Sequence, residues 1–291
     1  MRLTKYFKLF ESRTSELSEE EFFKIMKESC KDFINNPKYL QRVKNKFERT
    51  YSYIDPKIHN RTEGTDRNMA KNLLFLLDNL PAWKDYPKRN NSIIATSGHT
   101  KNSIYGRDYF IIIPFDDAKF GVVPGDDLWG CRFKVGENKS VCFGTLQSSM
   151  DDNKVLNSSY DIMIKDIQRL YENYEKSESL LANWSKALGQ FFDYIKNLGY
   201  ENVEQAFIDL LTPDKLVGFE SIPDDVVDKP DKHFRILNYY DIKSDGAEVW
   251  TDSKCLIYHL GHLAERNWED QGTSSQELFN SFLEKIKKYN E

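Results

Sequence analysis

The chain has 291 residues, 40% hydrophobic and 30% charged, so it has enough apolar side chains to bury a substantial core and is not disordered. Lysine and arginine total 41 against 46 aspartates and glutamates, and this net charge of −5 argues against broad, sequence-independent binding of nucleic acid. No apolar run approaches the roughly 20 residues of a membrane span, and four scattered cysteines without a CxxC pair indicate reduced thiols in a cytoplasmic protein.

Two helices are expected before the central sheet. The first begins at Ser18, because Ser18 and Glu21 fit a capping box in which each side chain accepts a hydrogen bond from the other residue's backbone. A short segment that holds Arg42 follows, and then a polar loop that contains Tyr51. The second helix begins near Thr65, where leucines recur at helical spacing.

The centre of the chain, residues 92–129, alternates apolar runs with turns. Runs of Ile, Val, Tyr and Phe bounded by Gly, Pro and Asp predict buried strands. The first run ends in Thr96, Ser97 and Gly98, so two hydroxyl groups are expected at a strand end, where a ligand could meet them. One more strand is predicted over residues 140–147.

The composition then changes, and residues 158–211 have the apolar spacing of amphipathic helices. The sheet resumes in the segments FRILNYY, GAEVW and CLIYHL, and a last helix begins near Thr273. The predicted fold is therefore α+β, with a small mixed β-sheet core, N-terminal helices and a helical insertion at about residues 150–215. The whole chain, residues 1–291, is predicted to be a single domain.

Three side chains are candidates for chemistry: Arg42 after an apolar Tyr-Leu pair, Thr96 with Ser97 at a strand end, and Glu248 at the start of EVWTDSKCLIY. Alone, each would be an ordinary surface or capping residue. Together, and in this order, they resemble the Arg–Ser–Glu class of the ADP-ribosyltransferase-like family. In that family an Arg closes the first strand, a Ser-Thr-Ser triplet ends a core strand, and a Glu begins a later strand. The segments WKDYPKRNNSIIATS and DYFIIIPFDDAKFGVVPGDDLW resemble the members from tailed phages in particular.

The resemblance implies a glycosyltransferase reaction in which ADP-ribose passes from NAD, used as a substrate, to a host macromolecule. Breaking the bond between nicotinamide and ribose involves an oxocarbenium-like state, as in glycoside cleavage. By the resemblance, Arg42 holds the pyrophosphate with a planar charged fork, and Glu248 is the catalytic carboxylate that faces the developing charge. Thr96, with Ser97 beside it, orients that carboxylate.

The resemblance also suggests further contacts to NAD and the class of partner. The backbone of Val43 would face the nicotinamide amide, and His99, just after the hydroxyls, is a candidate to line its pocket. Tyr105 and Tyr109 either stack on a ligand ring or belong to the core, where aromatic residues of strands usually lie. The acceptor would be a host protein, RNA or DNA, in the host cytoplasm if the chain is viral.

No membrane partner is expected, because no apolar run is long enough to span one. No metal is expected either: His259 and His262 have the spacing of metal ligands, but they fall at the end of an apparent strand and no third ligand is obvious.

Several positions depart from the family pattern. Thr96 keeps the hydroxyl of the first triplet position, Gly98 lacks the third, and Val43 stands where Gly is usual. Gly246 occupies the position where relatives that modify arginine carry a Glu that activates the acceptor. Either the acceptor is not an arginine, or another residue supplies the base, or NAD is hydrolysed. The alternative outside enzymology is a virion or interaction protein that keeps the fold and has lost catalysis.

Two neighbouring features have two interpretations each. Tyr239, Tyr240 and Asp245 precede the glutamate, where the family recognises its targets, and they fit either a target contact or an ordinary turn. Lys88-Arg89 with Arg107 forms a basic group that is expected to be a solvated face, with a phosphate or nucleic-acid contact as the sharper alternative.

Overall fold

The computed structural model describes residues 15–44, 49–58, 71–98, 108–125, 127–135, 139–153, 155, 159–174, 186–218, 233–262 and 271–290. The chain forms two compact units. The first consists of Met1–Gly64, Pro87–Val122 and Ile236–Glu291, and the second of Thr65–Tyr86 and Val123–Arg235. The second unit therefore takes in the segment that the sequence suggests is an insertion, together with an earlier helix.

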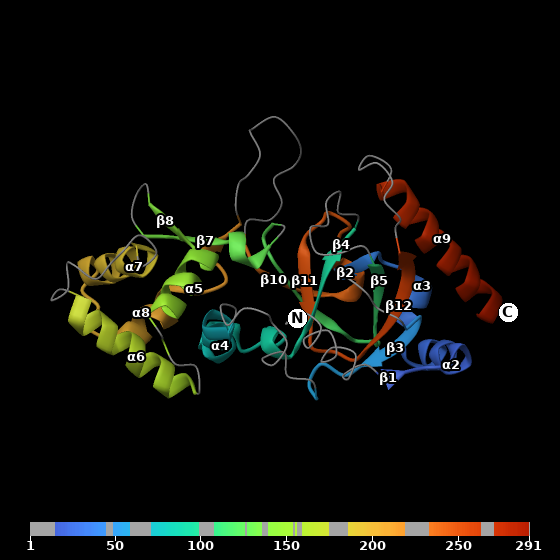
Figure 1. The fold of residues 1–291 in the computed structure, drawn as a ribbon, viewed down its shortest axis with the longest axis horizontal. Helices are drawn as coiled ribbons and strands as arrows, with labels where there is room; N and C mark the ends of the chain where they lie inside the picture. The colour runs from blue at the N-terminus through green and yellow to red at the C-terminus, as the bar shows by residue number, and fades with distance from the viewer. Residues whose placement is uncertain are drawn as a thin grey trace, which may run out of the picture. The chain divides into compact units, whose positions relative to one another are not determined.

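The first unit is built on one large sheet (Figure 1). Its strand order is β1-β3-β12-β5-β2-β4-β11-β6-β10, and each pairing from β1 through to β6 is antiparallel. The α+β class is confirmed, but the sheet is large and antiparallel rather than small and mixed. The strands are β1 (Ser15–Glu16), β2 (Leu40–Lys44), β3 (Tyr51–Ile54), β4 (Ile93–Ser97), β5 (Asp108–Pro114), β6 (Lys119–Val122), β10 (Arg235–Asn238), β11 (Glu248–Thr251) and β12 (Cys255–His262).

Helices α2 (Glu19–Ser29), α3 (Lys31–Asn35) and α9 (Gln271–Asn290) lie beside the β3–β12–β5 part of the sheet (Figure 1). The capping box at the start of α2 is confirmed, because the Ser18 side chain accepts from the Glu21 N–H at 3.2 Å and Glu21 Oε2 accepts from the Ser18 N–H at 2.9 Å. The amphipathic faces of these helices pack aromatic rings against the strands. Phe282 of α9 stacks on Tyr258 of β12 with ring centroids 4.0 Å apart.

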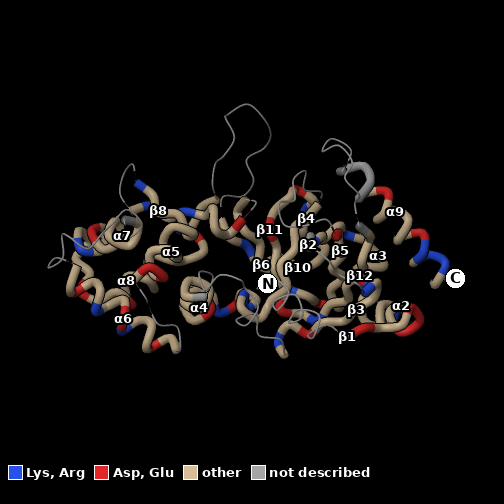
Figure 2. The backbone as a smooth tube through the Cα atoms, viewed as in Figure 1, with Lys and Arg blue, Asp and Glu red and all other residues tan. Residues whose placement is uncertain are grey.

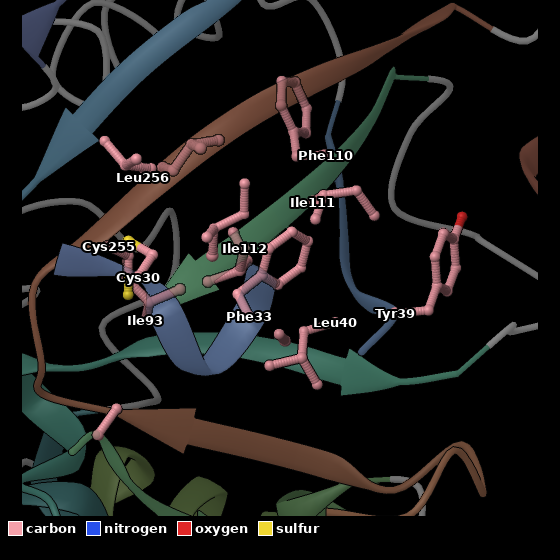
Figure 3. Close-up of a cluster of buried hydrophobic side chains, with 14 of the residues drawn as sticks. Cys30, Phe33, Tyr39, Leu40, Ile93, Phe110, Ile111, Ile112, Cys255 and Leu256 are labelled. Carbon is pink, nitrogen blue, oxygen red and sulfur yellow. The ribbon is translucent and has the colours of Figure 1, made fainter. Parts of the chain in front are cut away.

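The core of the first unit is centred on β5, in which all seven residues are buried. This strand has neighbours on both edges and packing on both faces, so from Tyr109 to Pro114 its sequence is a continuous apolar run rather than an alternating one. Figure 3 shows side chains from helices and strands meeting there, among them Phe33, Leu40, Phe110 and Ile112. The rigid core fixes β2 and β4, the two strands on which most of the candidate site residues lie.

Two local predictions were wrong. The polar loop around Tyr51 is strand β3, which pairs with β12 and alternates half-buried and buried residues. The buried Ser52 is polar, so the alternation of apolar and polar residues that marks a strand is not visible in this sequence. Only Ser140–Cys142 of the strand predicted over 140–147 is a strand, β8; helix α5 (Phe143–Asp152) follows, because Phe143, Leu146 and Met150 recur at helical spacing and are buried.

The second unit contains most of the helices, as predicted for residues 158–211. Aromatic packing joins them to a three-stranded sheet of order β8-β7-β9: Phe133 lies 5.8 Å from Phe191, which stacks on Phe207 at 5.0 Å. The elements besides α5 and β8 are α4 (Lys71–Asn79), β7 (Arg132–Lys134), α6 (Tyr160–Asn173), α7 (Lys186–Asn197), α8 (Val203–Leu210) and β9 (Leu216–Val217).

Charge is distributed along both units. Figure 2 shows lysines and arginines interspersed with aspartates and glutamates along the described backbone. None of the helices in the part of the chain that the structure describes combines the length and apolar character needed to cross a bilayer.

Candidate functional site

The candidate residues lie on three neighbouring strands, β2, β4 and β11. Glu248, the first residue of β11, is directly opposite Thr96 of β4, and Thr96 is directly opposite Gln41 of β2. Opposed residues on antiparallel strands have Cβ atoms about 4.5–5.5 Å apart and project from the same face. The sheet therefore brings the Thr96 hydroxyl beside the Glu248 carboxylate, from positions 152 residues apart in sequence (248 − 96).

Arg42 stands where β2 parts from β4. Strand β2 pairs with β4 only at Leu40 and Gln41, and then continues along β5 as far as Lys44. The guanidinium reaches back to β4, where Nη1 lies 3.5 Å from the carbonyl oxygen of Ile94. Burial lowers the pKa of Arg42 to about 10, and the negative charge of Glu248 opposes that shift. Arg42 is thus protonated at neutral pH and lies within electrostatic reach of Glu248.

Arg89 makes the most direct contact with Glu248. Its Nη2 atom lies 2.5 Å from Glu248 Oε1, and the exposed fractions of the two side chains are 5% and 13%. The prediction of a solvated face for Arg89 was therefore wrong. A guanidinium is costly to bury unless a carboxylate pairs with it, and Glu248 supplies that carboxylate.

The segment that carries Arg89 is fixed from two sides. Arg89 opens a 3₁₀ turn (Arg89–Asn91) that follows Lys88, whose carbonyl oxygen accepts a bond from Ser92 Oγ at 2.6 Å. The indole of Trp250 donates from Nε1 to the carbonyl oxygen of Pro87 at 2.8 Å. The Arg89 guanidinium lies over the same indole, 5.1 Å from the ring centroid, in the arrangement of a cation–π pair. Trp250 and Glu248 are two apart on β11, so they share a face.

Ser97 has a different partner from the one predicted. Its hydroxyl lies 2.9 Å from Asp245 Oδ1, which also accepts the Ala247 N–H at 3.1 Å. The Ser97 carbonyl oxygen accepts the Gly246 N–H at 2.6 Å. Ser97 therefore holds the turn that leads into Glu248 instead of orienting the carboxylate, because its side chain points to the opposite face of β4 from that of Thr96.

The same contacts constrain the loop that the family resemblance associates with targets. Asp245 is engaged by Ser97 and by the backbone, and Gly246 has φ 86°, a conformation that favours glycine. Tyr239 is 1% exposed, and its hydroxyl donates to the Asn36 carbonyl oxygen, so it is structural. Tyr240 is 48% exposed, with its hydroxyl 2.9 Å from an Asp32 carboxylate oxygen.

Several other predicted residues are not part of this group as described. His99, Tyr105 and Arg107 lie outside the described residues. The backbone of Val43 is opposite Tyr109 on the β5 side of β2.

His259 lies on β12, with Nε2 3.5 Å from Asp108 Oδ1 and its ring stacked on Phe110. Among the residues that the structure describes, no group of three or more His, Cys, Asp and Glu side chains is arranged to hold a metal ion.

Chemically, the site combines two guanidinium groups, Arg42 and Arg89, with one carboxylate and one hydroxyl. Such a set can bind an anionic ligand and stabilise a developing positive charge beside it. Sequence reasoning placed Arg89 in a basic group but missed its burial and its pairing with Glu248, because no apolar residue in the segment KRNN indicates burial. No known protein-family model, characterised protein or solved structure gives a significant match to this chain.

Proposed function

We propose that the chain is an NAD-dependent mono-ADP-ribosyltransferase with the fold of that family, acting on a host macromolecule. The observation that carries the proposal is the register of β4 and β11, which puts Thr96 directly opposite Glu248. The guanidinium of Arg42, on the neighbouring strand β2, interacts electrostatically with the same carboxylate. These are the residues that the Arg–Ser–Glu resemblance selects from three distant parts of the chain.

The chemistry assigns one role to each group. Arg42 binds the pyrophosphate of NAD, for which a planar and permanently charged fork is well suited. Glu248 binds a ribose hydroxyl and faces the positive charge that develops as the bond to nicotinamide breaks. Thr96, directly opposite Glu248 on the neighbouring strand, is assigned the orientation of the carboxylate. The bond between the anomeric carbon and nicotinamide breaks with its electron pair, so nicotinamide leaves as a neutral molecule. A nucleophile from the acceptor forms the new bond to the anomeric carbon, and its proton passes to solvent.

NAD hydrolysis is the second candidate, and the turn before Glu248 favours it over modification of arginine. Gly246 offers no side chain where arginine-modifying relatives carry a Glu, and the neighbouring carboxylate of Asp245 is already bound by Ser97 and Ala247. No group in this turn is therefore placed to activate a guanidinium acceptor, and water could take its place.

The test is Glu248→Gln, which keeps the size of the side chain and removes its charge. We expect nicotinamide release to fall by about 100-fold or more, while NAD binding measured by calorimetry changes little. Glu284→Gln is the matched control, because Glu284 is an exposed carboxylate on α9 in the same unit. If Glu248→Gln releases nicotinamide at the wild-type rate, the proposed role is removed.

Labelled NAD distinguishes transfer from the alternatives. With NAD labelled in the adenosine half and a host lysate, label on protein or nucleic acid supports transfer. Nicotinamide release without labelled acceptor supports hydrolysis. If wild-type protein does neither, the enzyme proposal fails and a non-catalytic interaction protein becomes the better interpretation.

A further inference from the structure

We propose that Arg89 is a positioning residue for the reaction: it clamps one oxygen of Glu248 and thereby aims the other at the substrate. The inference rests on the proposed function and extends it to residues that the family resemblance does not assign. It starts from the contact between Arg89 Nη2 and Glu248 Oε1 at 2.5 Å, made by two side chains that are 5% and 13% exposed.

The contact uses only half of the carboxylate. Oε1 is bound to Arg89, whereas Oε2 has no hydrogen bond or ion pair with the residues that the structure describes. A carboxylate fixed through one oxygen loses rotational freedom about its last torsion, which is otherwise broad. The free oxygen is then held on the face that Glu248 shares with Thr96.

The aim of the guanidinium is itself fixed by packing. Arg89 lies over the ring of Trp250, and Trp250 is anchored through Nε1 to the carbonyl oxygen of Pro87, two residues before Arg89. Strand β6 pairs with β11, and its Gly121 is directly opposite Trp250. A Cβ atom at Gly121 would overlap the indole ring. Gly121, Trp250, Arg89 and Glu248 thus form a continuous chain of contacts that ends at the proposed catalytic oxygen.

The two arginines therefore have separate tasks. Arg42 is assigned to the pyrophosphate, so its loss should weaken NAD binding. Arg89 is 4% exposed and engaged by Glu248 and Trp250, so it is not assigned a contact with NAD. Loss of Arg89 should leave NAD binding nearly intact and slow the chemical step. The reason is that a misaimed carboxylate can still contact bound NAD but no longer stabilises the transition state more than the ground state.

The test compares Arg89→Ala, Arg89→Lys and Arg42→Ala by nicotinamide release and by NAD affinity. We expect Arg89→Ala to lower kcat by about 100-fold with KM within about threefold. Arg89→Lys should recover little, since an ammonium group lacks the planar fork that stacks on Trp250. Added guanidinium ion, far below concentrations that unfold proteins, should restore activity to Arg89→Ala more than methylammonium does. Arg42→Ala should instead raise KM and the Kd for NAD.

Arg49→Ala is the matched control, because Arg49 is also ion-paired in the same unit, with Glu16, away from this site. If Arg89→Ala proves unstable, Trp250→Phe tests the same chain of contacts. It keeps an aromatic ring, loses the bond to Pro87, and should lower kcat without raising KM.

The outcomes separate this inference from the function on which it rests. If the wild-type protein releases no nicotinamide, the proposed function and this inference both fail. If the wild type is active and Arg89→Ala matches it in kcat, or loses activity only through KM, the inference alone is overturned. Equal activity of Arg89→Lys and wild type would show that Arg89 supplies only a positive charge and does not orient the Glu248 carboxylate. That result would also overturn the inference.

Discussion

At Gly121 the backbone of β6 passes directly against the indole of Trp250. A Cβ atom at this position would overlap three atoms of that ring, and Trp250 is 2% exposed, so the ring has little room to move aside. The requirement for glycine here comes from the close approach, since Gly121 is not among the glycines with positive φ. A single missing methyl group therefore sets the position of the ring on which Arg89 lies.

Gly121→Ala is expected to lower the free energy of unfolding by about 1–3 kcal/mol, the usual cost of overpacking a filled site. Urea denaturation followed by circular dichroism measures the change. Combining Gly121→Ala with Trp250→Leu gives the control, because the smaller side chain makes room for the new methyl group. If the two substitutions prove additive, the overlap is not the cause of the loss.

At the scale of single residues, the sequence was enough to propose part of the candidate site. Arg42, Thr96 and Glu248 could be selected because their order and local patterns match a family in which each has a chemical task. The pairing of Arg89 with Glu248 could not be predicted, because the burial of Arg89 depends on Trp250, a partner 161 residues later in the chain (250 − 89). The role of Ser97 was also misassigned, since neighbouring residues of a strand point to opposite faces and only one of the two hydroxyls can face Glu248.

Among the elements, the contact between α4 and α5 contains a buried polar network. Asp151 Oδ1 accepts from Gln147 Nε2 at 2.9 Å and from Asn72 Nδ2 at 3.1 Å, while Gln147 Oε1 accepts the Leu73 N–H at 2.6 Å. Within the described residues, Asp151 Oδ2 is buried without a hydrogen-bond partner. Burial raises the pKa of Asp151 above its ordinary value of 3.8, and the bonds from Gln147 and Asn72 oppose that rise.

A raised pKa means that the folded state favours the protonated form of Asp151. Its contribution to stability is therefore fully present below pH 3.8 and is lost as the pH rises through the higher pKa of the folded state. Asp151→Asn removes the charge and keeps the acceptor for Gln147 and Asn72. We expect it to raise Tm by a few degrees at neutral pH, with the difference shrinking toward pH 4.

Glu201→Gln is the control for the Asp151 experiment, because Glu201 is an exposed carboxylate in the same unit and does not contribute to the raised pKa of Asp151. Differential scanning calorimetry at several pH values makes the comparison. A lower Tm for Asp151→Asn at neutral pH would mean that the ionised carboxylate stabilises the fold.

Elements whose apolar residues follow one clear pattern were predictable from the sequence. Elements whose buried face also carries polar residues were not. The apolar run from Tyr109 to Pro114 in β5 and the capping box before α2 can both be recognised from the sequence alone. Strand β3 was mistaken for a loop because its inward-facing residues are Ser52 and Ile54, so the buried face is half polar. Helix α5 was mistaken for a strand because it follows β8 without a turn, and its polar Gln147 is one of the inward-facing residues.

At the scale of the whole molecule, the four cysteines can be used to measure how well each unit buries its side chains, because two lie in each unit. Cys30, Cys131 and Cys255 are 0% exposed, whereas Cys142 is half-buried and all four are free thiols. Burial raises the pKa of Cys30 and of Cys255, so their reactive thiolate forms are rare at neutral pH.

Iodoacetamide at neutral pH should therefore label Cys142 well before the other three cysteines in the native protein. Mass spectrometry of tryptic peptides over time gives the order. Unfolded protein provides the control, in which all four should react at similar rates. Labelling of Cys30 or Cys255 at the rate of Cys142 would contradict the buried positions.

The chain leaves the large sheet for the second unit twice, over Thr65–Tyr86 between β3 and β4 and over Val123–Arg235 between β6 and β10. The second excursion starts and returns on strands that are adjacent in the sheet. Neither segment contributes a residue to the pairing of β4 with β11, so insertions or deletions within them would leave the paired residues unchanged. A lineage could thus diversify its outer part rapidly while the pairing of residues 96 and 248 is inherited intact.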